Sequence, residues 1–361
     1  MGAAGSSVMA GLPVADAMQL GAALARHAKG SAPAFVLQEL MRSKLDHLPL
    51  PACGKTLARW QALAAVAEHD LSLAKLYEGH LDALAILQEL QASCVPTSNA
   101  GGPSVWGVWA AESPGGRVHI DPGPADGGKC VRLHGTKHWC SGAATVSHAL
   151  LTAWPPNSTQ PQLVLVAMDQ PGIYIHGDAW KAVGMQASSS LQVHFDGAVA
   201  QLVGSAGAYL SRPGFWQGGA GIAACWYGGA CGIASALHRA VAEAPAGAAS
   251  NVFRLAALGR VDTQLRSTAA LLVQTAAWID ANPQQDASAP ALRARLAAAR
   301  CATDVLEAST AALGAGALCL DAAFAQAAAD LPVFIRQSHA DRDYAALGEK
   351  LGQLAAADWA L

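Results

Sequence analysis

The feature that most constrains the fold is a change of pattern in the middle of the chain, where short β-like runs replace helical periodicity. Between about residues 104 and 205 these runs are separated by Pro/Gly/Asn/Asp turns, such as those at 121–124 and 155–158. The runs are VWGVWAAE, GRVHI, CVRLHGTKHW, HALLTAW, QLVLVAMD, GIYIH and LQVHFDGAVAQLVG. Strands at this spacing, with no helices between them, predict an antiparallel barrel or sandwich and not a Rossmann unit. In agreement, no GxGxxG sequence opens a helix and no Walker A sequence occurs.

Helical patterns lie on both sides of this β-region. Leu and Ala recur with helical spacing through residues 58–92, and Pro96 with the polar, Gly-containing stretch 97–103 ends that pattern. After residue 212 we expect an apolar helix, a helix over roughly 252–281, a loop at 282–285 and a long helix over 291–313 that Gly314-Ala315-Gly316 breaks. The sequence therefore predicts an α+β protein with an N-terminal helical domain (1–103), a β-domain (104–205) and a C-terminal four-helix bundle (206–361).

Residues 214–237 contain no charged residue and are long enough to span a bilayer. Seven glycines between positions 214 and 232, together with Gln217, favour a different interpretation. Gly228 and Gly232 have the spacing that lets two helix backbones approach closely. We expect a helix buried on all sides, in a bundle or a subunit interface, and no membrane span.

Composition narrows the class of protein. Only 14% of the 361 residues are charged, and 52% are hydrophobic, which leaves little polar surface for a monomer and favours a homo-oligomer. The net charge of −3 gives no electrostatic footprint for nucleic acid. The eight cysteines include no CxxC pair, which favours reduced thiols in a cytoplasmic protein. The twelve histidines show no HExxH spacing, so no metal site is expected.

Three motifs, in order along the chain, resemble motifs of the acyl-CoA dehydrogenase family of flavoproteins. Residues 137–142, KHWCSG, are similar to that family's strand end Lys-x-Trp-Ile-Thr-Asn-Gly, and residues 111–114, AESP, to its Thr-Glu-Pro segment. Residues 183–196 resemble the family's Gly-(Met/Ile)-Arg-x-Ser block before the last strand. The resemblance covers about residues 50–361 and implies the family's fold, its FAD cofactor and assembly as a dimer or tetramer.

The resemblance also implies a flavin site. It assigns to the flavin Trp109, Ala110 and Ala111 along the pyrimidine side, and Trp139, Cys140 and Ser141 at the strand end. An isoalloxazine ring needs an apolar surface on one face and hydrogen-bond donors near N1, O2 and N5. In a regular strand Trp139 and Ser141 lie on one face, and His138 and Cys140 lie on the other. Trp139 would supply the apolar surface and Ser141 a hydrogen-bond donor. From the residues alone, Trp139 fits a barrel core and Ser141 a turn equally well.

The ADP half of FAD has fewer matching residues in this sequence. The family grips the pyrophosphate with Arg-x-x-x-Phe-Gly from a neighbouring subunit, and that motif does not occur here. Arg254 is the best placed cation in the region, although it also fits a solvated arginine at a helix start. Gly314 and Gly316 resemble the family's Phe-Gly-Gly-x-Gly, and a helix C-cap explains Gly314 as well.

The catalytic carboxylate of acyl-CoA dehydrogenases has no counterpart at either of the family's positions. At the position near the C-terminus, an ungapped match on Arg336 places Ala345 where the family has its glutamate. At the position early in the first bundle helix, residues 219–223 contain no carboxylate. The residues that could substitute are His339, Asp341 and Asp343. His339 and Asp343, four apart, can share a helix face and act as a general base, or the segment is simply a polar helix start.

The missing carboxylate leaves three functions open. We place first an FAD-dependent α,β-dehydrogenation of an acyl thioester with a relocated base, with an electron-transfer flavoprotein or oxygen as the acceptor. The alternative is a flavin-dependent monooxygenase on the same fold, which needs no such base and uses reduced flavin and oxygen. The third is a catalytically degenerate flavin-binding or assembly protein.

Overall fold

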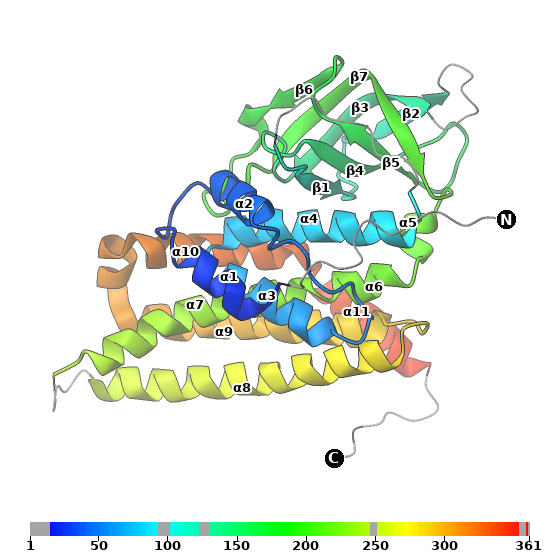
Figure 1. The fold of residues 1–361 in the computed structure, drawn as a ribbon. Helices are drawn as coiled ribbons and strands as arrows, with labels where there is room; N and C mark the ends of the chain where they lie inside the picture. Colours follow the sequence, from blue (N-terminus) through cyan, green and yellow to red (C-terminus); the bar gives the residue numbers. More distant parts are fainter. Residues whose placement is uncertain (1–14, 93–101, 123–129, 246–250, 354–358, 360–361) are drawn as a thin grey trace.

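The computed structural model describes residues 15–92, 102–122, 130–245, 251–353 and 359. Helices come first along the chain, then a curled sheet, then a second set of helices, so the expected α+β fold is confirmed. Figure 1 shows helix α4 (Leu71–Glu89) running beneath the sheet, with the long helices of the C-terminal half on its other side. The site described below lies along α4.

The N-terminal half contains α1 (Ala17–Leu24), α2 (Pro33–Arg42), α3 (Thr56–His69) and α4. The helical pattern over 58–92 forms two helices, because Asp70 has an extended backbone and its side chain accepts a hydrogen bond from Leu73 N at 2.7 Å. Helix α3 packs closely against α7 (Ile222–Ala242), since a Cβ on Gly228 would lie 2.2 Å from Ala64 O. The close backbone approach expected at Gly228 is thereby confirmed.

All seven predicted β-runs form strands. They are β1 (Trp106–Trp109), β2 (Val118–Pro122), β3 (Cys130–Cys140), β4 (His148–Ala153), β5 (Gln162–Ala167), β6 (Ile173–His176) and β7 (Leu191–Val203). The order in the sheet is β1-β4-β5-β7-β3-β2, and β6 pairs with β7. Every pair is antiparallel except β1 with β4, so the sheet is mixed and not purely antiparallel as predicted. Ile120 N donates to Trp154 O at 2.9 Å, which draws β2 against the end of β4 and curls the sheet.

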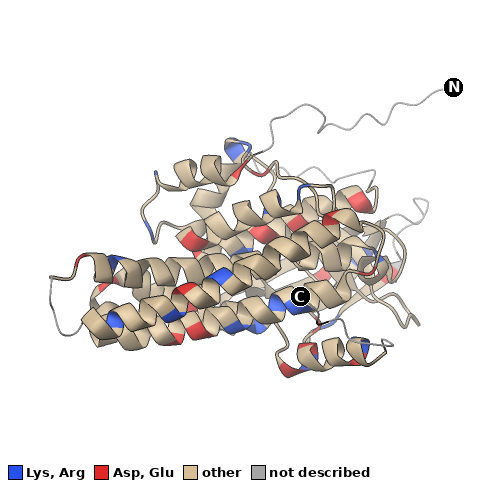
Figure 2. Cartoon of the chain, turned by 90° about the horizontal axis from the view of Figure 1, so that it is seen from below, with Lys and Arg blue, Asp and Glu red and all other residues tan. Residues whose placement is uncertain are grey.

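The C-terminal half contains α5 (Ala208–Ser211), α6 (Gly214–Gly219), α7, α8 (Asn251–Ala281), α9 (Ser288–Leu320), α10 (Ala322–Phe334) and α11 (Asp341–Gly352). Gly314 has φ 70° and ψ −174° and kinks α9, which confirms the predicted break. Figure 2 shows acidic and basic residues interspersed along these helices, with most of the helical ribbon in that view formed by other residues. The secondary structure changes near the predicted boundaries 103 and 205, and packing of α3 against α7 joins the two helical parts.

The apolar segment forms α6 and α7. Residues Gly214–Ala242 are long and apolar enough to cross a membrane by length and composition. However, 78% of the most apolar window of this segment is buried inside the protein, the environment expected for a core helix.

Candidate functional site

The end of β3 has an irregular backbone that sets the direction of its side chains. The register with β7 shifts between Lys137 and Cys140, and Trp139 has φ 58°, a conformation that costs a large side chain about 1–3 kcal/mol. This bulge overrides the predicted alternation: Trp139 is 54% exposed, Cys140 is fully buried and Ser141 is half-buried. Burial also raises the pKa of the Cys140 thiol well above its usual range, so that side chain belongs to the core.

An ion pair between buried Lys137 and exposed Glu112 fixes this strand end to its neighbours. The Lys137 side chain is 1% exposed, and its Nζ donates to Glu112 Oε1 at 2.7 Å and to Thr152 Oγ1 at 2.8 Å. Burial lowers the pKa of Lys137, and the hydrogen bond to Glu112 opposes that shift. For Glu112 burial raises the pKa, but hydrogen bonds from Lys137 and Thr152 outweigh it and leave the pKa below its usual value. The ends of β1, β3 and β4 therefore meet at one charged contact.

Ser141 takes part in a hydrogen-bond chain whose direction can be deduced. Ser188 Oγ donates to Met185 O at 2.7 Å, because a carbonyl only accepts. Ser190 Oγ lies 2.9 Å from Ser188 Oγ and 2.8 Å from Ser141 Oγ. Each hydroxyl has one proton, so Ser190 donates to Ser188, and Ser141 donates to Ser190. Ser141 Oγ is left with lone pairs alone for a ligand, where the sequence predicted a donor.

The residues assigned to the pyrimidine side face three different environments. Trp109 is buried, and its Nε1 donates to Ser141 O at 3.0 Å, which joins the ends of β1 and β3. Ala110 is half-buried and lines a cavity, whereas Ala111 is exposed. The contact between Trp109 and Ser141 supports the prediction that these two segments form one site.

That cavity, of about 220 Å³, lies between β1 and the helices. Val108 and Ala110 border it on the side of the β-domain. Five charged side chains line it: Lys75, Glu78 and Asp82 on α4, Arg212 before α6, and Arg295 on α9. Its size is below the roughly 300–1,000 Å³ of most small-molecule sites, so its ligands are small.

Asp82 is the carboxylate in this cavity best suited to proton transfer. It is half-buried and has no hydrogen bond from any residue that the structure describes. Burial and the neighbouring Glu78 raise the pKa of Asp82 to about 6, against the lowering effect of Arg212 and Arg59. Sequence reasoning missed it, although Lys75, Glu78 and Asp82 have the i, i+3, i+7 spacing of one helix face.

Two arginines complete the cavity wall. The Arg212 side chain is 5% exposed, and its Nη1 donates to Glu89 Oε2 at 2.7 Å. Arg295 donates from Nη2 to Gln337 O at 3.3 Å. Burial lowers the pKa of Arg295, and the charge of Asp343 opposes that shift. In both residues Nε is buried and has no acceptor within the described parts of the chain.

The structure brings two of the three predicted base residues together, but away from this cavity. His339 Nδ1 lies 3.6 Å from Asp343 Oδ1, as the i, i+4 spacing predicts. Asp343 is buried and accepts from Ser338 Oγ and His339 N, so it holds the turn before α11. The His339 side chain is 65% exposed, and Asp341 is exposed. Asp343 Oδ2 also lies 3.9 Å from Arg295 Nη2, behind the cavity wall, and the catalytic role of these residues stays a prediction.

The residues predicted for the ADP half lie at the far end of the α8–α9 pair. Arg254 is half-buried, with no hydrogen bond or ion pair to a described residue. Gly314 and Gly316 are exposed, and a Cβ on either would meet nothing within 4 Å. No hydrogen bond joins these residues to the end of β3 in the described chain. Their predicted role depends on a neighbouring subunit and stays a prediction.

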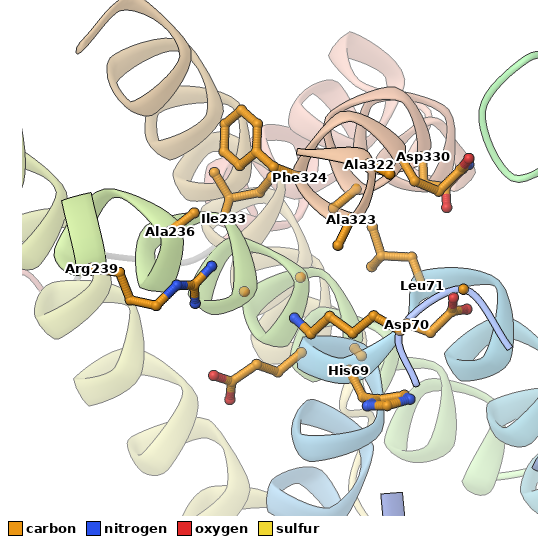
Figure 3. A pocket seen from close by; sticks show the side chains of 18 residues that line it. His69, Asp70, Leu71, Ile233, Ala236, Arg239, Ala322, Ala323, Phe324 and Asp330 are labelled. Atoms are coloured by element: carbon orange, nitrogen blue, oxygen red, sulfur yellow. The ribbon is translucent and has the colours of Figure 1, made fainter. Parts of the chain in front are cut away.

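A larger cavity, of about 500 Å³, lies between α7, the start of α10 and the turn from α3 to α4 (Figure 3). Asp330 in its wall accepts hydrogen bonds from Met185 N and Gln326 Nε2, and Asp70 caps α4. None of the residues predicted for flavin or catalysis lines it. Among the described residues, no group of three His, Cys, Asp or Glu side chains could hold a metal ion. We therefore place the candidate site at the smaller cavity.

No protein-family model matches the sequence, and no curated protein sequence matches it. Solved structures do match. KijD3, in complex with FMN and a dTDP-linked sugar, has a TM-score of 0.76 and 19% identity over 98% of both chains. TdsC from Paenibacillus sp. A11-2, with FMN and indole, has a TM-score of 0.72 and 18% identity over 92% of this chain and 96% of its own.

Methanesulfinate monooxygenase MsuC from Pseudomonas fluorescens has a TM-score of 0.66 and 19% identity, over 94% of this chain and 97% of its own. At these identities the likeness shows the fold, and it is the acyl-CoA dehydrogenase-like fold expected from the sequence motifs.

Proposed function

We propose that this protein is a flavin-dependent monooxygenase that uses reduced FMN and oxygen on a small polar substrate. The observation that carries the proposal is the cavity beside β1, which measures about 220 Å³ and is lined by five charged side chains. A long acyl thioester needs an extended slot, and a cavity of about 220 Å³ is too small for one. The function placed second from the sequence is thus favoured over acyl-thioester dehydrogenation.

The solved structures that resemble this chain support the same order. MsuC is named a monooxygenase, and TdsC is named dibenzothiophene monooxygenase. Two of the similar structures contain FMN, which favours FMN over the FAD expected from the sequence.

The end of β3 fits an isoalloxazine ring. Trp139 exposes 54% of its surface, so a flat apolar ring is available for stacking without rearrangement of the core. Ser141 Oγ is directed as an acceptor by the serine chain, which suits a ligand edge that carries an N–H group. Reduced flavin has such a group at N5, whereas N5 of oxidised flavin is itself an acceptor. We therefore assign Trp139 and Ser141 to the flavin and expect the reduced form to bind more tightly.

When bound, reduced FMN supplies two electrons and two protons, so the reaction balances as RH + O2 + FMNH2 → ROH + H2O + FMN. One oxygen atom enters the substrate, and the other leaves as water. Asp82 stands in the cavity with a pKa of about 6, and its carboxyl can take up or release a proton beside the substrate near neutral pH. Trp139 and Ser141 hold the ring, and the charged cavity walls orient the substrate.

Anaerobic titration tests the cofactor assignment. We expect tryptophan fluorescence to show tighter binding of reduced FMN than of oxidised FMN or FAD. Mixing that complex with isotopically labelled oxygen and small polar substrates should give a product with one labelled oxygen by mass spectrometry. Bleaching of oxidised flavin by an acyl-CoA without oxygen would instead support dehydrogenation, and a protein that binds no flavin would support the degenerate alternative.

We also propose that the chain forms a homo-oligomer through the start of α8. Val252, Phe253 and Leu255 are 64%, 76% and 50% exposed, and Leu320 at the adjoining end of α9 is 89% exposed. Val252, Phe253 and Leu255 flank Arg254 in the chain, so the same surface would bring a second copy to the predicted phosphate-binding cation. Light scattering coupled to size-exclusion chromatography should show a dimer or tetramer, and Phe253→Asp should shift it toward the monomer.

A further inference from the structure

Two arginines in the wall of the cavity beside β1 have hydrogen-bond donors without partners among the described residues, and these donors indicate the chemical class of the ligand. Buried polar atoms in proteins nearly always have partners. Within the described chain, two atoms of the residues that line this cavity are buried without one, Arg212 Nε and Arg295 Nε. A guanidinium only donates, so a ligand that completes this wall must bring acceptor oxygens.

We propose that Arg212 and Arg295 bind an anionic group of the substrate, a carboxylate or another oxyanion. This inference rests on the monooxygenase function proposed above and adds to it the chemical class of the substrate. Arginine presents its donors as a planar fork that matches two oxygens of an oxyanion, and such charge-assisted bonds are the strong ones.

The acidic partners that the two arginines already have lie outside the cavity. Glu89 accepts from Arg212 Nη1 at 2.7 Å, and the carboxylate of Asp343 lies 3.9 Å from Arg295 Nη2. Neither acid lines the cavity. Arg212 is therefore held from outside the cavity and Arg295 by Gln337 O in the cavity wall, while the Nε donors of both have no partner among the described residues. This arrangement fixes the two forks in place before a ligand arrives.

Asp82 couples anion binding to pH. Its carboxyl has no hydrogen bond from the described residues, and the charged groups that act on it are Glu78 and Lys75 on α4, Arg59 on α3, and Arg212. An ionised Asp82 repels an anion in the same cavity, and a protonated Asp82 does not. The pKa of Asp82 is about 6, so affinity for an anion should fall as pH rises through this value.

Two matched pairs of ligands test the proposal: acetate against acetamide, and benzoate against benzamide. The acid and the amide of each pair have nearly the same shape and differ in charge. The smaller pair is included in case benzoate and benzamide are too large for the cavity. Calorimetric titration of the full chain at pH 5.5 without flavin should show that at least one acid binds and its amide does not. Arg295→Gln should weaken binding of that acid by about 10- to 100-fold, the range for charge-assisted hydrogen bonds.

Arg293→Gln is the matched control, because it removes the same charge from the same helix but lines a different cavity. It should leave acid binding unchanged. Asp82→Asn should retain at pH 7.5 the affinity that the unsubstituted protein shows at pH 5.5. Circular dichroism checks that each variant is folded. If Arg295→Gln unfolds, Arg295→Lys takes its place in the binding test, because it keeps the charge but loses the planar guanidinium.

Equal binding of acid and amide, or undiminished acid binding by the Arg295 variant, would overturn the proposal. It would also be overturned if Arg295→Gln reduced FMN affinity to that of riboflavin and left acid binding intact, since the arginine would then hold the cofactor phosphate. Because these titrations contain no flavin, failure of FMN to bind would refute the proposed function and leave the anion result standing.

Discussion

The ion pair between Lys137 and Glu112 predicts an unequal response to removal of its two members. Lys137 is 1% exposed, and its three ammonium protons go to Glu112 Oε1, Thr152 Oγ1 and Thr152 O at 2.7, 2.8 and 3.2 Å. Glu112 is 37% exposed and also accepts from Thr152 Oγ1 and Trp154 Nε1. Glu112→Ala therefore leaves a buried ammonium without its counterion. Lys137→Met leaves a carboxylate with two donors and access to water.

We expect Glu112→Ala to lower the free energy of unfolding by about 3 kcal/mol at pH 7. This is the lower end of the usual cost of a buried unpaired charge, because Thr152 keeps two acceptors for the ammonium. Lys137→Met should cost about 1–2 kcal/mol, the net value of the hydrogen bonds it loses. The double variant should be more stable than Glu112→Ala alone, since it carries no buried charge.

Urea unfolding followed by circular dichroism, at pH 7 and pH 9.5, measures these values. Burial lowers the pKa of folded Lys137, and without Glu112 it falls further, so the unfolded chain binds more protons and stability rises with pH. The deficit of Glu112→Ala should therefore shrink at pH 9.5. The reasoning is refuted if Glu112→Ala and Lys137→Met cost the same, or if the deficit of Glu112→Ala is equal at both pH values.

Two further substitutions test the β-domain side of the site, and a third tests the packing of the segment before β7 against α10. Ser190→Ala removes the acceptor of the Ser141 proton, so anaerobic titration should show a smaller preference for reduced over oxidised FMN; an unchanged preference would contradict the direction of the serine chain. Trp139→Ala removes the exposed ring and should weaken FMN binding about tenfold with an unchanged circular dichroism spectrum; undiminished binding would remove Trp139 from the site. Gly184→Ala would put a Cβ 1.9 Å from Ala329 O, so calorimetry should show a melting temperature lower by several degrees, and no change would contradict this packing.

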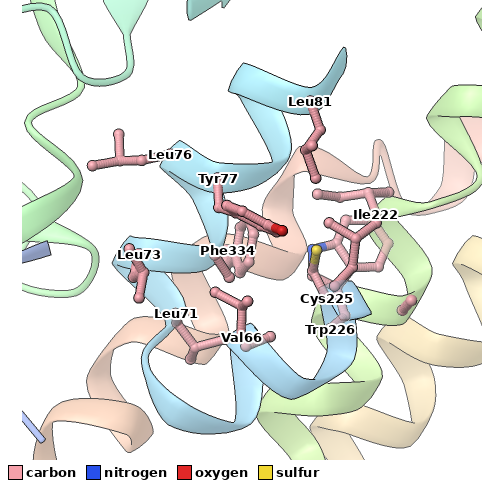
Figure 4. Packing of buried hydrophobic residues seen from close by; sticks show 14 of the residues in the cluster. Val66, Leu71, Leu73, Leu76, Tyr77, Leu81, Ile222, Cys225, Trp226 and Phe334 are labelled. Atoms are coloured by element: carbon pink, nitrogen blue, oxygen red, sulfur yellow. The ribbon is translucent and has the colours of Figure 1, made fainter. Parts of the chain in front are cut away.

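Much of the fold followed from local patterns. Each of the seven β-runs became a strand, because turn residues bound each run. The uncharged segment after residue 213 was expected to be buried, and Figure 4 shows Cys225 and Trp226 of α7 packed near Tyr77 of α4 and Phe334 at the end of α10. The break at Asp70 could not be located from the spacing of apolar residues, since that spacing continues through it; the extended backbone of Asp70 and its capping bond divide the helices.

The site was only half predictable, for a physical reason. Trp109 and Ser141 were assigned to one site because their motifs resemble those of acyl-CoA dehydrogenases, and Trp109 Nε1 does donate to Ser141 O. Asp82, Arg212 and Arg295 lie on three segments far apart in the chain and meet only through tertiary packing. On its own, the face of α4 that carries Asp82 has the pattern of a solvated helix surface.

The residues predicted as a displaced base near the C-terminus have other partners in the structure, and their catalytic role stays a prediction. The carboxylate of Asp343 accepts hydrogen bonds within the turn before α11 and lies near Arg295. The segment before this turn contributes Gln337 to the cavity wall. Arg212 and Arg295 in this wall favour the anionic substrate proposed above. Under that proposal, we assign proton transfer to Asp82 on α4, in the same cavity. If the ionised form of Asp82 acts as the base, kcat should rise as pH rises through about 6, while affinity for the anionic substrate falls. The two effects oppose each other in kcat/KM, which should therefore change less with pH than either quantity. Asp82→Asn should abolish the pH dependence of both kcat and anion affinity.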